Sequence, residues 1–203
     1  MLRETILNIL YNIWPMVIIV SVILISLRLT YLFVHKEKFV FYKETFMLGL
    51  VIYVLCLFHV VTFQDVSWST SNFIPFKEMF RYEFNSPMFF RNVVCNMLMF
   101  VPFGFFVAYF LKTSKVRYAL FLSSIVSCTI EITQLMIGRV FDIDDIFLNV
   151  LGGIIGFYMF DMVYEVNKIL PKALKKNYFY NIITLIILIV VILYLVNVIK
   201  VGV

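Results

Sequence analysis

The chain has 203 residues, of which 63% are hydrophobic and only 14% are charged. A water-soluble domain cannot hide that much apolar surface, so the composition indicates a membrane protein. The net charge of +5 is interpreted as a signal of membrane topology and not as a surface that binds nucleic acid.

Six apolar runs are each long enough to cross a bilayer as a helix of about 20 residues. In chain order they cover residues 13–34, 46–63, 93–111, 118–137, 146–164 and 182–199. No run alternates as a membrane β-strand does, so the predicted fold is all-α, a polytopic bundle of about six transmembrane helices in the cell membrane. We expect a membrane domain of five helices over residues 1–166, then a basic linker and a C-terminal transmembrane helix over residues 167–203.

Basic residues are distributed unevenly between the connections. The segments after the first, third and fifth runs hold ten Lys and Arg residues, and the other segments hold six. The positive-inside rule therefore places those three connections in the cytoplasm and the second and fourth connections outside. Arg28 lies inside the first run and is expected to extend toward the cytoplasmic surface.

The second connection, residues 64–91, is the longest and is rich in aromatic residues such as Trp68, Phe73 and Phe80. Aromatic side chains favour the headgroup zone of a membrane, so we expect the connection to lie there. A short interfacial helix is predicted around residues 77–84, after a turn that begins at Asn72. In the next run, Asn92 and Asn96 are four residues apart and are expected to share one helix face.

The fourth run carries a polar stripe in which Ser123, Ser127, Glu131 and Gln134 recur at helical spacing. Glu131 lies about 9 Å below the outer end of the helix at the usual rise per residue. A carboxyl group at that depth is a candidate functional group. The structural alternative is a buried pair with Arg139 that only fixes the fold.

The fourth connection is very short, so the fourth and fifth helices are predicted to be antiparallel neighbours. Asp142 is expected to cap the fifth helix with its carboxylate. Asp142, Asp145 and Asn149 are spaced to share one face of that helix, whereas Asp144 is expected to point elsewhere as a solvated charge.

Gly152 and Gly156 follow on the fifth helix as a small-xxx-small pair. Such a pair lets another helix backbone approach closely. We expect this packing to hold Asp145 and Asn149 against the polar stripe of the fourth helix.

Three stretches of the chain resemble the VanZ family. They are N-F-I-P-F from Asn72, the stretch from Asn92 that ends in M-F-V-P-F-G, and residues 127–156 with Glu131, Gln134 and R-V-F-D-I-D-D-I-F-L-N-V-L-G-G. The resemblance covers roughly residues 10–165 and implies a membrane protein linked to low-level resistance to the glycopeptide teicoplanin. It supplies a phenotype and no reaction.

The first hypothesis is a binding protein at the outer face of the membrane. Its ligand would be a membrane lipid, a lipid-linked cell-wall precursor or the lipoglycopeptide itself, with Arg139 holding a phosphate or carboxylate. The predicted site consists of Glu131, Arg139, Asp142, Asp145 and Asn149, and it is lined by Asn72, Asn92, Asn96 and Gln134.

The second hypothesis is a hydrolase or transferase that acts on a lipid-linked envelope substrate, with Glu131 as general acid or base. No cofactor is expected, although a divalent cation at Asp142 and Asp145 is an open alternative. A proton-coupled transporter is a third hypothesis, which the lack of an evident inverted repeat disfavours.

Overall fold

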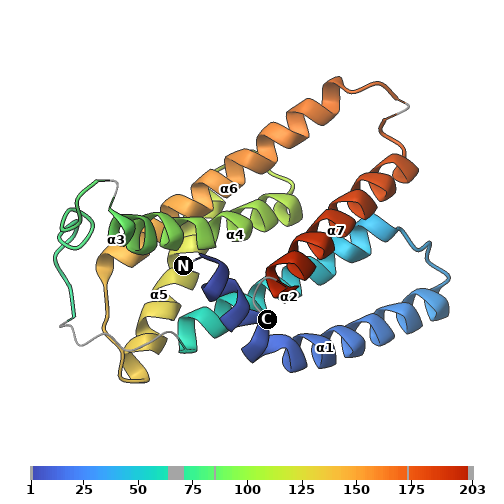
Figure 1. The fold of residues 1–203 in the computed structure, drawn as a ribbon. Helices are drawn as coiled ribbons and strands as arrows, with labels where there is room; N and C mark the ends of the chain where they lie inside the picture. Colours follow the sequence, from blue (N-terminus) through green and yellow to red (C-terminus); the bar gives the residue numbers. More distant parts are fainter. Residues whose placement is uncertain (1, 64–70, 85, 173, 201–203) are drawn as a thin grey trace. The chain divides into compact units, whose positions relative to one another are not determined.

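The computed structural model describes residues 2–63, 71–84, 86–172 and 174–200 (Figure 1). Within these residues the long elements are the helices α1 (Leu2–His35), α2 (Phe41–Phe63), α4 (Cys95–Leu111), α5 (Arg117–Met136), α6 (Ile143–Ile169) and α7 (Asn177–Lys200). The short helix α3 (Pro87–Phe89) and the π-helical turn η1 (Phe90–Val94) lead without a break into α4. Ser86 caps α3 by accepting a hydrogen bond from the Phe89 N–H, and Pro87 occupies the first helical position.

Six helical stretches in the described part of the chain are long and apolar enough to cross a membrane. They are Tyr11–His35, Phe41–Phe63, Pro87–Leu111, Arg117–Met136, Ile143–Ile169 and Asn177–Asn197. The predicted all-α fold with six transmembrane helices is therefore confirmed. The hydropathy pattern was sufficient because only helices can satisfy their backbone hydrogen bonds while crossing lipid singly.

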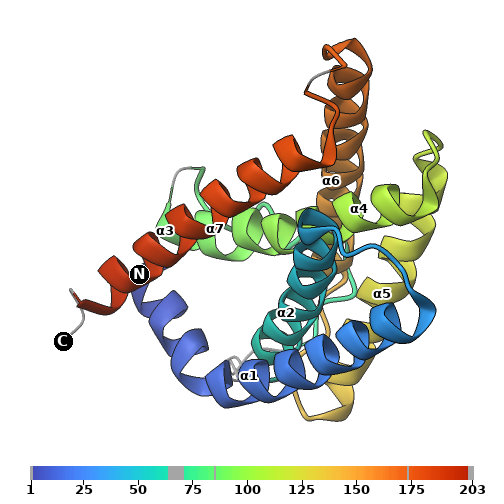
Figure 2. The same cartoon turned by 90° about the vertical axis from the view of Figure 1, so that its right-hand side faces the viewer.

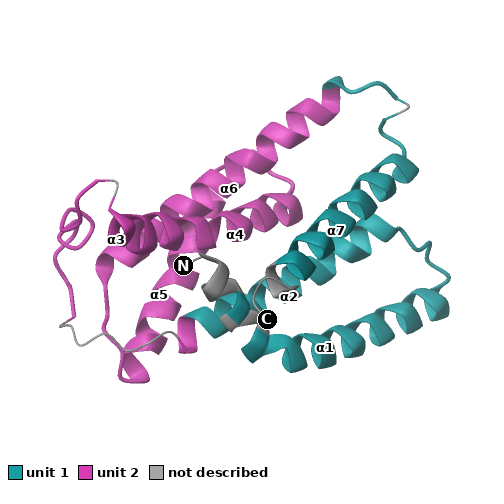
Figure 3. Cartoon of the chain, in the orientation of Figure 1, with its two compact units in different colours: residues 1–60, 169–203 teal, residues 61–168 magenta. Residues whose placement is uncertain are grey.

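The chain forms two compact units (Figure 3). Unit 1 contains residues 1–60 and 169–203, and unit 2 contains residues 61–168. The predicted division into residues 1–166 and 167–203 remains a prediction.

Unit 1 groups α7 with α1 and most of α2. Arg28 on α1 donates two hydrogen bonds to the Glu44 carboxylate on α2, at 2.8 and 3.1 Å. The backbone N–H of Tyr42 on α2 donates to the side chain of Asn181 on α7 at 3.0 Å. Arg28 thus has a paired partner in the first turn of α2, and these polar contacts connect three otherwise apolar helices.

Unit 2 is built around the glycines of α6. A Cβ atom added to Gly152 would lie 2.0 Å from the carbonyl oxygen of Met97, and one on Gly156 would lie 1.9 Å from that of Val101. On the other side of the helix, a Cβ on Gly153 would lie 2.0 Å from the hydroxyl of Ser123. The predicted close approach is confirmed, and its partners are the backbone of α4 and the polar stripe of α5.

The connection at residues 71–84 differs from its prediction. Residues 75–81 form a succession of turns in place of the interfacial helix expected around residues 77–84. The left-handed backbone of Phe76, at φ 66°, interrupts helical geometry just before that segment. Figure 2 shows this loop beside α3, and Trp68 lies outside the described residues.

The glycine contacts predict the effect of one added methyl group. Gly156→Ala should destabilise the protein by about 2 kcal/mol, because the methyl group would overlap the Val101 carbonyl and force α6 away from α4. The measurement is thermal unfolding of the purified protein in detergent. Gly49→Ala on α2 is the matched control, because an added Cβ there meets nothing within 4 Å. Equal melting temperatures for the two variants would contradict the close packing.

Candidate functional site

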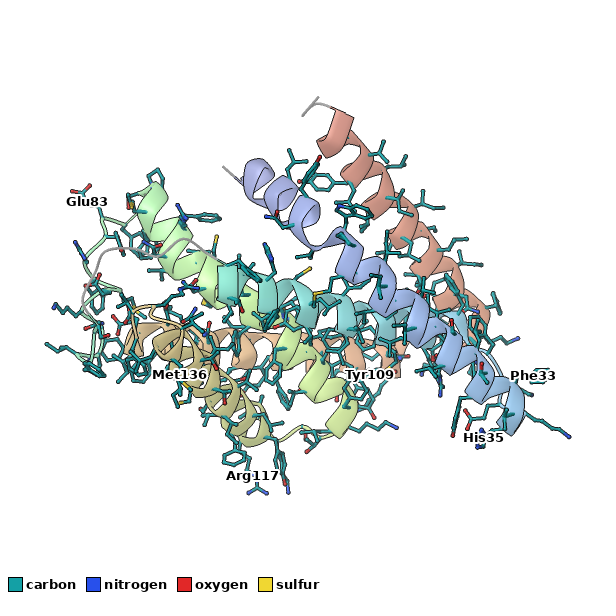
Figure 4. All side chains as sticks on the ribbon, turned by 90° about the horizontal axis from the view of Figure 1, so that it is seen from below. Phe33, His35, Glu83, Tyr109, Arg117 and Met136 are labelled. Carbon is teal, nitrogen blue, oxygen red and sulfur yellow. The ribbon has the colours of Figure 1, made fainter. Side chains whose placement is uncertain are left out.

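The predicted polar residues gather at one end of unit 2, which we call the polar end. It comprises the last turns of α5, the connection at residues 137–142, the first turns of α6 and the loop at residues 71–84. Figure 4 shows Glu83 and Met136, which belong to this end, on the left, with Tyr109 and Arg117 farther to the right.

Gly138 sets the position of Arg139. It has φ 83°, which glycine adopts without steric cost. The Gly138 N–H donates to the Leu135 carbonyl at 3.1 Å and the Arg139 N–H to the Gln134 carbonyl at 2.9 Å, which is the Schellman arrangement that ends a helix. The turn brings Arg139 back over the end of α5, where its guanidinium donates to the Val61 carbonyl.

Glu131 is only 2% exposed and both of its carboxylate oxygens have partners. One accepts from the Asp142 N–H at 3.0 Å. The Gln134 amide satisfies its surroundings when its nitrogen donates to the other Glu131 oxygen, at 3.1 Å, and its oxygen accepts from Arg139 at 3.3 Å. Gln134 therefore stands between Glu131 and Arg139, where a direct ion pair was the structural alternative.

Asp142 caps α6 as predicted. One carboxylate oxygen accepts both from the Asp144 N–H and from the Asn72 side-chain amide, each at 2.9 Å. The backbones of Asn72 and Asp142 also form a parallel bridge, through Asn72 N–H to Phe141 and Ile143 N–H to Asn72. Burial raises the pKa of the Asp142 carboxyl above its ordinary value, and the two hydrogen bonds partly offset that effect.

The prediction that Asp144 is a solvated charge was wrong. The residue is 2% exposed, and its carboxylate accepts three backbone hydrogen bonds from the loop at residues 71–84. The donors are Phe76 at 2.5 Å, Glu78 at 2.8 Å and Met79 at 3.0 Å. No local pattern signals this role, because the donors lie more than 60 residues away in the sequence.

Asp145 and Asn149, both on α6, form hydrogen bonds to different helices. Asp145 is half-buried and accepts a hydrogen bond from Asn96 on α4 at 2.6 Å. Asn149 is buried and donates to Ser127 on α5 at 2.9 Å. Asn92 lies in the π-helical turn η1, half-buried, one turn before Asn96. The predicted contact of Asn149 with the polar stripe of α5 is confirmed, whereas Asp145 contacts α4.

The hydrogen bonds divide the polar residues into those that hold the backbone and those that retain atoms without a hydrogen bond. Glu131, Asp142 and Asp144 are engaged in holding the backbone of the polar end. Arg139 and Asp145 are half-buried, and in the described part of the chain one carboxylate oxygen of Asp145 and most of the guanidinium of Arg139 have no hydrogen bond. The charges of Arg139, Asp145 and Glu131 are close enough to influence one another.

The described side chains of His, Cys, Asp and Glu include no group of three placed to hold a metal ion. Asp142 and Asp145, the pair considered for a divalent cation, each already accept a hydrogen bond from an Asn side chain. A cation would have to complete its coordination from water or a bound phosphate.

The role of Glu131 in holding the connection predicts a difference between two substitutions. Glu131→Leu should cost about 2 kcal/mol of stability, because the Asp142 N–H loses its buried acceptor. Glu131→Gln should stay close to wild type, because its oxygen still accepts from Asp142 while Gln134 turns to donate to Val61. Thermal unfolding in detergent compares the two, and equal losses would contradict this hydrogen-bond network.

A comparison with protein-family models matches residues 45–165 to the VanZ/LLP1 family. Searches of curated proteins and of solved structures found no match to the chain. The matched range includes the whole polar end, with the Asn72 loop, Asn96, Glu131, Arg139 and the acidic first turns of α6. Because the match spans more than half of the 203 residues and the fold has six membrane-spanning helices, this chain is a multi-pass membrane protein of the VanZ/LLP1 family.

Proposed function

We propose that this protein contributes to low-level glycopeptide (teicoplanin) resistance by binding an amphipathic envelope molecule at the polar end of unit 2. The ligand is a membrane lipid, a lipid-linked cell-wall precursor or the lipoglycopeptide itself. The observation that carries the proposal is that, in the described part of the chain, half-buried Arg139 and Asp145 retain atoms without a hydrogen bond, whereas Glu131, Asp142 and Asp144 hold the backbone around them.

The distribution of charge supports an extracytoplasmic position for this end. Lys112 and Lys115 lie between α4 and α5, and Arg117 begins α5, at the opposite end of unit 2. Lys172, Lys175 and Lys176 follow α6, which also runs away from the polar end. By the positive-inside rule those basic connections are cytoplasmic, so the polar end faces outward.

The chemistry of the site suits a ligand with an anionic group and an apolar part. A guanidinium binds a phosphate or carboxylate through paired hydrogen bonds, and Asp145 can accept from a hydroxyl or ammonium group. Beside them, the rings of Phe73 and Phe141 are stacked with centroids 5.2 Å apart, and Phe73 is 66% exposed. The aromatic pair offers a surface for an acyl chain or an aromatic ring.

The other predicted site residues have supporting roles in this proposal. Glu131 and Asp142 fix the connection that carries Arg139, and Gln134 orients the guanidinium. Asn72 and Asn96 hold the carboxylates of Asp142 and Asp145, and Asn149 ties α6 to α5. Asn92 is assigned to the lining because it lies one turn from Asn96.

An enzyme is the second candidate, favoured by the clustering of Glu131, Asp142 and Asp145, of which Glu131 and Asp145 lie within electrostatic range of Arg139. In that reading Glu131 is the general acid or base of a hydrolase or transferase, and Arg139 stabilises the anion that forms. Formation of a product from a lipid-linked substrate would favour this candidate. Stoichiometric binding without turnover would favour the binding protein.

The proposal predicts which substitutions abolish protection. Arg139→Ala, Asp145→Asn and Glu131→Gln should each reduce teicoplanin tolerance of a producing host to that of the host without the protein. Arg139→Ala removes the anion-binding group, and Asp145→Asn changes the hydrogen-bonding oxygen. Glu131→Gln leaves the fold intact but turns the Gln134 amide toward Val61, so that it no longer orients the Arg139 guanidinium. The measurement is the inhibitory concentration of teicoplanin at matched membrane levels of each protein, verified by immunoblot.

Two controls make the outcome specific. Arg91→Ala removes an exposed arginine on the same side of the membrane and should keep full protection. A glycopeptide without an acyl chain tests whether the apolar part of the ligand contributes. Full protection by all three variants at the site would contradict the proposal.

A further inference from the structure

The loop at residues 74–81 is held in one shape by a buried carboxylate from a transmembrane helix. Asp144 lies in the first turn of α6, and it accepts the backbone N–H groups of Phe76, Glu78 and Met79. Three backbone donors on one carboxylate are the arrangement that organises an anion-binding turn, here filled by a side chain of the same protein. The loop is therefore specified from within unit 2.

The backbone of the loop includes an unfavourable conformation at Phe76, which the hydrogen bond to Asp144 stabilises. Phe76 has φ 66°, a region that non-glycine residues with bulky side chains seldom adopt. The Phe76 N–H points at Asp144, and its ring stacks on Phe147 of α6 with centroids 5.3 Å apart. Both the backbone and the side chain of Phe76 are thus fixed against the start of α6.

The fixed loop displays apolar side chains on the surface of the protein. Phe80 is 80% exposed, and Ile74 and Phe76 are also exposed. A cluster of large apolar side chains in water is unfavourable, and its presence on a surface marks a contact with an apolar partner. Exposed Lys77 lies in the same loop and can contact phosphates, whereas exposed Arg81 pairs with Glu78 at 3.0 Å.

The position of the loop in the chain identifies that partner. Exposed Phe84 and Met88 continue the apolar surface from the loop into α3 and the span Pro87–Leu111. A surface that is continuous with the lipid-facing side of a transmembrane helix, and that mixes aromatic with basic residues, fits the boundary between headgroups and acyl chains. These features favour the bilayer over another protein as the occupant of this surface.

We propose that residues 74–81 form a lipid-contacting loop that enters the outer leaflet through Phe80, and that Asp144 sets its conformation. This contact goes beyond ligand binding at Arg139, and it holds whether or not the protein protects against a glycopeptide. It gives Asp144 the role of a positioning residue, because its side chain acts on the membrane contact only through the loop.

The test places one fluorescent reporter in the loop of the full chain. The variant carries Trp14→Phe, Trp68→Phe and Phe80→Trp and is reconstituted into phosphatidylcholine–phosphatidylglycerol vesicles. Lipids brominated on the acyl chain near the glycerol should remove most of the emission at position 80, and aqueous iodide should remove little. Strong quenching by iodide with none by the brominated lipid would overturn the lipid contact and leave a water-exposed or protein-docking loop.

The role of Asp144 is tested in the same background with Asp144→Asn, which keeps one acceptor oxygen and loses the other. Quenching at position 80 should then shift from the brominated lipid toward iodide, because the loop is no longer held by all three donors. Asp161→Asn is the matched control, since Asp161 lies on the same helix, far along it from the loop. An unchanged quenching ratio in Asp144→Asn, in protein that remains monodisperse by gel filtration, would overturn the positioning role.

Discussion

The close approach of α6 to the backbone of α4 is the contact on which the polar end depends. Gly152 and Gly156 leave no room for a side chain between the two helices. Apolar burial cannot drive helices together inside lipid, so small residues and interhelical hydrogen bonds provide the association. With α6 at this distance, Asp145 reaches Asn96 on α4 and Asn149 reaches Ser127 on α5. Larger residues on α6 would separate these polar partners.

The three acidic residues at the start of α6 then make contacts with three different parts of unit 2. Asp142 binds the Asn72 segment, Asp144 binds the turns that follow it, and Asp145 faces α4. Carboxylates near a membrane are costly unless they are satisfied, and backbone N–H groups of the loop supply the three partners of Asp144. The same hydrogen bonds that reduce this cost also order the loop. In the described part of the chain, Arg139 and Asp145 retain atoms without a hydrogen bond, and our proposal assigns ligand binding to them.

Some features of the site could be predicted because their causes are local in the sequence. The stripe of Ser123, Ser127, Glu131 and Gln134 follows from helical periodicity, and all four side chains are buried. The cap at Asp142 follows from its place before an apolar helix. The error at Asp144 has an equally physical origin. Its spacing placed it off the face of Asp142 and Asp145, and nothing nearby indicated that a distant loop would cover it.

The sequence by itself determined that the chain crosses the membrane six times, and which helix faces are polar. Bilayer thickness and helical periodicity impose both properties on any segment, whatever its neighbours are. Only the tertiary structure decided the hydrogen-bond partners of these polar groups. Gln134 lies between Glu131 and Arg139, and the Arg139 guanidinium donates to the Val61 carbonyl. The backbone of a distant loop donates to Asp144. These contacts join residues up to 78 positions apart. They depend on the turn at Gly138 and the glycine packing of α6, whose combined geometry no single segment encodes.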